Sequence, residues 1–582
     1  MAVAMGDVGS ADLAILESSQ RSRLLTAFAA ILNTGDSPDH IRRHDVIPPT
    51  PPGMSWAVLV AVQRRAPDAL DEVLRDPAVG AWAFRLLRRV AYGAAAEQGG
   101  EPPARAGANL FATLAAAAAI RAGMPCSLRI PARRGRLWLP SLGMTGTVGR
   151  GEWAIVGVES RAHGTVVFGD SGSVRLPDDL SRPAEGWSPV PVIDVTEQGR
   201  RLLLDHLSPY RDFRGVRDPA WLPAKDVRRW RELLREAYEL LRARHPAAHR
   251  TVTRTVRSLV PVDGRSALRV VSATVPDAYG AITMSLPADA VSLAVTLVHE
   301  ARHQLLSTID DLTPLFTPVL EGPEPAYFAP WRGDPRPLRG LLYGAHAFMG
   351  VAVFWQNQRH EGGERADFEF ALHRWQLRIA LAALRGATGL TEAGGRIVAT
   401  LAEAGRALWR EPVHGTAAWL ADLCCRDILA GWRAAHLVVR ENDAAALARR
   451  WSAGLPPPRS LPGTRIGEHH PALPGDGRTW LARLRCTDQE AFERARALAD
   501  GPLGIADVAL ISGDPAKALP LYRSASADPG AWIGMGLAGD SRTSPLLERP
   551  ELVLALHAAL RRDGVRPPGP EELAEWLSAA RC

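Results

Sequence analysis

Residues 296–306 read TLVHEARHQLL, and no other stretch constrains the fold and the chemistry of this chain as strongly. His299, Glu300 and His303 stand in the order H-E-x-x-H. Residues i and i+4 of an α-helix lie on one face, so the two imidazoles can bind one ion. Two imidazoles on a largely apolar helix need polar partners. This favours a metal site over a surface helix that carries two histidines by chance.

The third metal ligand is less clear from the sequence. The chain has Leu306 and Ile309 where the metzincin pattern needs glycine and histidine, so that class is excluded. His346 lies in the predicted helix LYGAHAFMGV and is the preferred candidate. A buried histidine is often only a hydrogen-bonded core residue, so acidic side chains remain alternatives: Glu321, Glu324 and Asp334.

Such a ligand set suits either of two metals. With zinc, the site would activate a water, and Glu300 would be the general base of a hydrolase. With Fe(II), it would leave positions for oxygen and a co-substrate such as 2-oxoglutarate. The distal carboxylate of 2-oxoglutarate needs a cation, ideally a guanidinium. Arginines in and after the motif supply candidates: Arg302, Arg332, Arg336 and Arg339.

The sequence around the motif predicts a mostly α fold with a small β component (α+β). Two strand-like runs, ALRVVSATV and AITMSLP, precede the motif helix, which indicates a zincin-like helix flanked by short strands. We expect a helical N-terminal region (1–196) with a β-rich layer at about 125–195, then a metal-binding core (197–375). A helical C-terminal region (376–582) follows, with a hairpin of the tetratricopeptide kind that turns at Gly513.

Composition limits the function classes. The 582 residues include 69 basic and 63 acidic side chains, and the net charge of +6 comes without a Lys/Arg-rich run, so nucleic acid is not an expected partner. Five cysteines without a C-x-x-C favour a reducing cytoplasm over a disulfide framework. The longest apolar run, 110–120, is too short to span a bilayer, and no signal peptide is recognisable. We therefore expect a cytoplasmic protein without a membrane partner.

Residues 200–380 resemble a known family. The segments LSPYRDFRG, LVPV, VVSATVPDAYGAITMSLPADAVSLAVTLVHEARHQLLSTIDDLTPL and YFAPWRGDPRPLRGLLYGAHAFMGVAVFW look like the HExxH-domain proteins of actinobacterial peptide-maturation clusters. In those clusters a radical-SAM maturase of the FxsB type crosslinks a ribosomal precursor peptide into a cyclophane. The resemblance implies an Fe(II), 2-oxoglutarate and O2-dependent β-hydroxylase of such peptides, with iron at His299 and His303. Only these two residues and Glu300 carry over from the family motif.

Two other functions use the same residues. A zinc metallopeptidase could remove a leader peptide, with Glu300 as its base. A non-catalytic partner of the radical-SAM enzyme could use the helical C-terminal region to hold the peptide. The arginines and the resemblance favour oxidation, and the intact motif argues against a purely structural role. Ala301 and Arg302 depart from the bulkier or uncharged residues expected in relatives, which alters the predicted pocket but no ligand.

Overall fold

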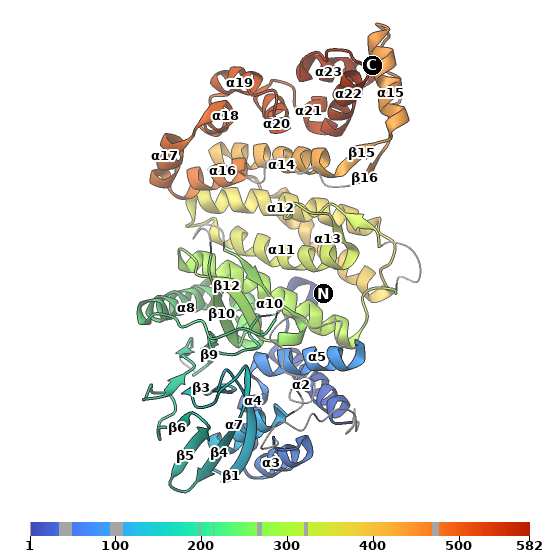
Figure 1. Ribbon diagram of the computed structural model, residues 1–582. Coiled ribbons are helices and arrows are strands. Elements are labelled where there is room, and N and C mark those ends of the chain that lie inside the picture. The colour runs from blue at the N-terminus through green and yellow to red at the C-terminus, as the bar shows by residue number, and fades with distance from the viewer. Residues whose placement is uncertain are drawn as a thin grey trace. The chain divides into compact units, whose positions relative to one another are not determined.

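We describe the protein from a computed structural model, in which residues 2–33, 49–92, 107, 109–196, 199–212, 215–264, 270–318, 324–467 and 477–581 are described. These residues form mostly helices, with a seven-stranded sheet, a five-stranded sheet and two small two-stranded sheets (Figure 1). The chain divides into two compact units. Gly6–Pro314 form the first unit, and Leu315–Cys582 with Val3–Met5 form the second. Each unit has a hydrophobic core of its own.

The N-terminal helices of the first unit pack around an aromatic cluster. The rings of Phe28, Trp82 and Phe111 have centroids 5.1–5.9 Å apart, and Trp56 meets Phe111 edge-on at 6.2 Å. Such contacts add to the stabilisation that burial gives. The fully buried alanines after Phe111 let their helix approach the sheet closely. The helices are α1 (Ala2–Met5), α2 (Ser10–Asn33), α3 (Pro52–Arg65), α4 (Pro67–Leu74), α5 (Pro77–Tyr92) and α7 (Phe111–Arg121).

The larger sheet of the first unit is antiparallel, in the order β6-β5-β4-β1-β2-β3-β7. Strand β4 alternates buried and half-buried residues, the pattern of a strand with one face on a core. The β1–β2 turn uses positive φ at Arg134 and Gly135. The strands are β1 (Cys126–Arg133), β2 (Arg136–Leu139), β3 (Gly143–Thr147), β4 (Trp153–Arg161), β5 (Gly164–Gly169), β6 (Gly172–Arg175) and β7 (Trp187–Pro189).

The smaller sheet positions the motif helix. Its order is β11-β12-β10-β9-β8, with β10 parallel to both neighbours and antiparallel strands at the two edges. Helix α10 packs on α8, α9 and α2, and it also contacts the edge strand β11. The elements are β8 (Val192–Asp194), β9 (Arg201–Leu204), α8 (Ala224–Arg244), α9 (Pro246–Thr255), β10 (Ser258–Val262), β11 (Ser272–Ala273), η2 (Pro276–Ala278), β12 (Ala281–Ser285) and α10 (Ala290–Leu312).

The second unit begins with a stack of long helices. Helix α12 packs on α11, α13 and α14, and Figure 1 shows α11, α12 and α14 lying side by side. By length and composition α11 could cross a membrane, and 67% of its most apolar window is buried in the protein, as in a core helix. The elements are β13 (Ala326–Tyr327), β14 (Arg336–Pro337), α11 (Leu338–Gln358), α12 (Gly363–Arg385), α13 (Glu392–Arg410) and α14 (Gly415–His436).

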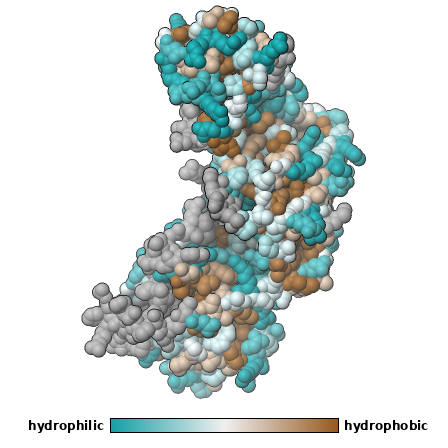
Figure 2. All heavy atoms as spheres, turned by 90° about the vertical axis from the view of Figure 1, so that its right-hand side faces the viewer, coloured by the Kyte–Doolittle hydropathy of each residue, from teal (hydrophilic) through white to brown (hydrophobic). Residues whose placement is uncertain are grey.

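Short helices form the remainder of the second unit. Many begin at proline, whose missing N–H costs nothing in the first turn. The buried guanidinium of Arg478 ties several of them together, because it donates to Asp427 (2.6 Å), Asp507 (2.7 Å) and the Gly530 carbonyl (2.8 Å). Positive φ at Gly513 separates α18 from α19. In Figure 2, the surface near α15, α22 and α23 is mostly hydrophilic on the side in view.

The bounds of these C-terminal elements complete the chain. They are β15 (Leu437–Val439), α15 (Glu441–Ser452), β16 (Thr464–Ile466), α16 (Gly477–Thr487), α17 (Gln489–Leu498), α18 (Gly501–Ile511), α19 (Pro515–Ser524), α20 (Pro529–Ala538), α21 (Pro545–Glu548), α22 (Pro550–Arg562), α23 (Pro570–Ser578) and η3 (Ala579–Arg581).

The predicted α+β class, mostly helical with a smaller sheet component, is confirmed. The five-stranded sheet joins residues on both sides of position 196, because β8 lies before that position and β9 after it. The division into regions 1–196, 197–375 and 376–582 stays a prediction.

Candidate functional site

Helix α10 carries His299, Glu300 and His303. It begins after Asp289, whose side chain accepts a hydrogen bond from the backbone N–H of Ser292 at 2.7 Å, an N-cap that satisfies one free donor of the first turn. Apolar side chains in the same helix are buried, including Leu297 and Leu305. Burial of this face fixes the rotation of the helix and therefore the direction of the motif residues.

The two imidazoles converge. The Nε2 atoms of His299 and His303 lie 3.1 Å apart, and the ring planes are at 80°. Two nitrogen ligands about 2.1 Å from one ion lie about 3.0 Å apart at a right angle and about 3.4 Å apart in a tetrahedron. The observed separation falls between these values. The pair therefore fits a single ion of either geometry, although the same distance also suits an N–H···N hydrogen bond.

The protonation state of His303 suits a ligand. Burial is the main cause that lowers its pKa, to about 4; His299 adds to the shift and Glu300 opposes it. The ring is consequently neutral near pH 7. A metal-binding imidazole must be neutral, so His303 does not have to lose a proton at that pH before it can bind an ion.

Glu300 is buried, with only 2% of its surface exposed. Its Oε1 accepts a hydrogen bond from the Ser272 hydroxyl at 2.7 Å, which ties the motif to the edge strand β11. Its Oε2 has no hydrogen-bond partner among the described residues. A buried carboxylate oxygen that has neither a hydrogen-bond donor nor a cation beside it lowers the stability of the fold. Glu300 is thus oriented on one side and has acceptor capacity on the other.

Arg302 is buried beside the N-terminal segment. A Cβ placed on Gly6 would come within 1.9 Å of its Nη1, and Gly6 has φ +70°. Burial lowers the pKa of Arg302 to about 9. The guanidinium therefore packs against Gly6, and its predicted contact with a co-substrate remains a prediction.

His346 lies on α11 of the second unit and is fully buried. Its Nε2 is 3.0 Å from the backbone carbonyl of Val3, which belongs to the same unit. A carbonyl can only accept, so Nε2 carries the proton and donates. If His346 binds a metal, it does so through Nδ1.

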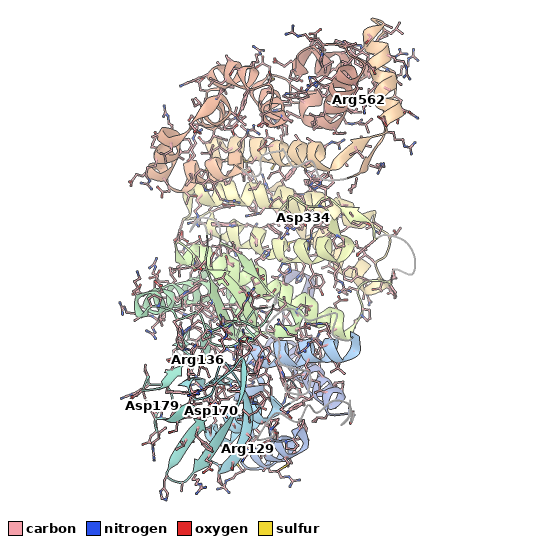
Figure 3. The ribbon with its side chains drawn as sticks, viewed as in Figure 1. Arg129, Arg136, Asp170, Asp179, Asp334 and Arg562 are labelled. Carbon is pink, nitrogen blue, oxygen red and sulfur yellow. The ribbon has the colours of Figure 1, made fainter. Side chains whose placement is uncertain are left out.

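The three later arginines also belong to the second unit. Arg332 and Arg336 pair with Asp334, labelled in Figure 3, at 3.0 and 3.2 Å, and these bonds keep the pKa of Asp334 low although burial opposes them. Arg339 lies over the Phe316 ring, 4.6 Å from its centroid. Glu324 is exposed, and Glu321 lies outside the described residues.

The structure therefore brings four predicted residues together on one helix: His299, Glu300, Arg302 and His303. The other candidates belong to the second unit. Among the described residues, no three His, Cys, Asp or Glu side chains are grouped as ligands of one ion. Sequence reasoning missed Ser272, because no motif marks a serine that meets Glu300 from a strand 28 residues earlier.

Comparisons with known proteins add no assignment: no family model matches the chain, and no curated protein matches it either.

Proposed function

We propose that this protein is an Fe(II)- and 2-oxoglutarate-dependent dioxygenase that hydroxylates a β-carbon in a ribosomally made precursor peptide. The observation that carries the proposal is the convergence of the His299 and His303 Nε2 atoms at 3.1 Å. The choice of iron over zinc rests on the sequence resemblance of residues 200–380. The same resemblance supports a radical-SAM maturase as a partner, whereas the cytoplasmic location that we propose rests on the cysteine pattern.

We propose the following roles for individual residues in binding the metal and the co-substrate. His299 and His303 would hold the ion in a zincin-like arrangement, and His346, through Nδ1, is the proposed third ligand. The ion would supply oxidation of a C–H bond together with 2-oxoglutarate and O2. Arg302, Arg332, Arg336 and Arg339 remain the proposed partners of the co-substrate carboxylate.

Glu300 would orient the site rather than accept a proton. The Ser272 hydroxyl fixes one carboxylate oxygen, and burial keeps the side chain away from bulk water. The second oxygen is then available to a ligand imidazole or to a water near the ion. A carboxylate that orients a ligand typically changes metal affinity 10–100-fold when it is removed.

The edge strand β11 offers a place for an extended peptide. Among the described residues it pairs with β12 alone, and Ser272 of this strand contacts Glu300. A peptide that adds to a sheet edge gains main-chain hydrogen bonds and places alternate side chains towards one face. We propose that the precursor peptide binds along this edge, which would bring one residue close to the histidine pair.

The same edge also favours a second candidate, a zinc metallopeptidase. An extended substrate beside an HExxH helix is the arrangement that a peptidase needs, and the Oε2 of Glu300 would then serve as the base. This candidate predicts a cleaved peptide and no need for 2-oxoglutarate.

The test is an incubation of the anaerobically purified protein with Fe(II), 2-oxoglutarate, air and the peptide encoded beside its gene. Mass spectrometry should detect a product heavier by one oxygen atom, formed only when 2-oxoglutarate is present. His299→Ala should abolish it. Cleavage of the peptide with zinc in the absence of 2-oxoglutarate would instead establish the peptidase.

A further inference from the structure

A cavity lies in the first unit, apart from the motif residues. Its volume is about 330 Å³, within the range of small-molecule sites, and helices α2, α4, α5 and α9 with η2 form its walls. The lining is mixed: apolar side chains such as Leu24, Leu74 and Phe84 share it with five arginines and four carboxylates. A cavity with apolar walls and a few converging charged groups is typical of a binding site.

The charge in this cavity is concentrated around one carboxylate. Arg257 bonds directly to Glu17, while the guanidiniums of Arg254 and Arg75 lie 3.6 and 3.8 Å from its oxygens. These two distances exceed hydrogen-bonding range, and both side chains are nearly half exposed (46% and 48%). Three cations thus surround one anion, and two of them have room for a second acceptor.

The other two arginines of the cavity, Arg21 and Arg23, have closer partners. Arg21 binds Asp71 at 2.6 Å. Arg23 donates to the Pro276 carbonyl at 3.0 Å and lies 4.0 Å from the centroid of the Phe84 ring. The excess positive charge therefore belongs to the group of Arg75, Arg254 and Arg257.

We infer that this cavity binds a small organic anion, whose carboxylate or phosphate contacts Arg75 and Arg254 and whose apolar part packs on Leu24, Leu74 and Phe84. Guanidinium groups bind both kinds of anion through paired, charge-assisted hydrogen bonds. Glu17 would share its arginines with the ligand.

The site is separate from the histidine pair but connected to the same helix. Gln20 of α2 donates to Asp311 of α10 at 3.0 Å, and Arg23 lies 3.5 Å from the same carboxylate. Asp311 is eight residues beyond His303, about 12 Å along a helix. A ligand in the cavity would therefore lie beside residues that contact this helix about 12 Å from His303, and it would not contact the proposed metal ligands.

Isothermal titration calorimetry of the full chain tests this inference, with inorganic phosphate and hexanoate as separate probes in a buffer containing sodium chloride. We expect saturable binding of at least one probe, and the tighter one identifies the anionic group. The double variant Arg75→Gln/Arg254→Gln should weaken it about tenfold or more, because it removes both guanidiniums that contact the anion. The matched control Arg161→Gln removes an exposed arginine from β4 and should change nothing.

Two further variants sharpen the result. Glu17→Gln, once its thermal transition shows that it folds, should bind the same probe more tightly, because the competing carboxylate charge is gone. His299→Ala should bind as the wild type does, which separates this site from the proposed metal site. The inference is overturned if neither probe binds, if the double variant binds equally well, or if folded Glu17→Gln binds more weakly.

Discussion

Removal of the Ser272 hydroxyl should destabilise the first unit and disturb the motif. In Ser272→Ala the Oε1 atom of Glu300 loses its 2.7 Å donor, and Oε2 already has no hydrogen-bond partner among the described residues. An unsatisfied group in a side chain that is only 2% exposed costs about 1–3 kcal/mol. For a unit of about 300 residues, an unfolding entropy near 2.1 cal/mol/K per residue converts this into a Tm lower by about 2–5 °C.

Differential scanning calorimetry of the metal-free protein measures this shift. Ser173→Ala is the matched control, because Ser173 is exposed on β6, also an edge strand. Its transition should stay within about 1 °C of the wild type, as expected for a surface substitution. If Ser272→Ala unfolds at the same temperature as Ser173→Ala, the hydrogen bond does not hold Glu300 and the argument for an oriented carboxylate fails.

Three other changes test separate parts of the structure. Burial raises the pKa of Asp76 to about 7, so its contribution to stability is present below pH 4 and lost as pH rises to 7. Urea unfolding should show that the free energy of unfolding falls less between pH 4 and pH 7 in Asp76→Asn than in the wild type. Arg478→Met leaves two carboxylates without their shared cation and should cost about 3–5 kcal/mol in urea unfolding, whereas Arg494→Met on the surface should cost less than 1 kcal/mol. His346→Ala should weaken iron binding by at least the roughly 10–100-fold that follows loss of an outer-shell partner, and His299→Ala should do the same. Undiminished iron binding in His346→Ala would assign the third ligand to another residue.

The sequence pattern predicted those features that depend only on residues close to one another in the chain. The helix around His299 and His303 follows from its spacing, its apolar face and the acidic cap at Asp289, all of which lie within about 15 residues. The predicted side-by-side placement of the imidazoles needs only the helical repeat. The division of the chain into helices and short strands depends on the same local preferences, so the α+β class could be predicted from the sequence.

Contacts between segments that are distant in the chain could not be predicted from local sequence patterns. Ser272 meets Glu300 across 28 residues, and the carbonyl of Val3 meets His346 across 343. The arginine cluster around Glu17 joins three separate elements. Neither composition nor periodicity states which buried side chain will face which partner, because tertiary packing decides it. The predicted role of Arg302 shows the same limit, since nothing local indicated that Gly6 would lie against it.

The central claim, an iron and 2-oxoglutarate site at His299 and His303, is tested most directly by visible absorption spectroscopy without oxygen. Addition of 2-oxoglutarate to the Fe(II)-loaded protein should produce the charge-transfer band of an iron–keto-acid chelate, with one chelate per chain. The band should be absent in His299→Ala and should persist in Arg161→Gln. No band with the wild-type protein, together with one tightly bound zinc per chain, would contradict the account.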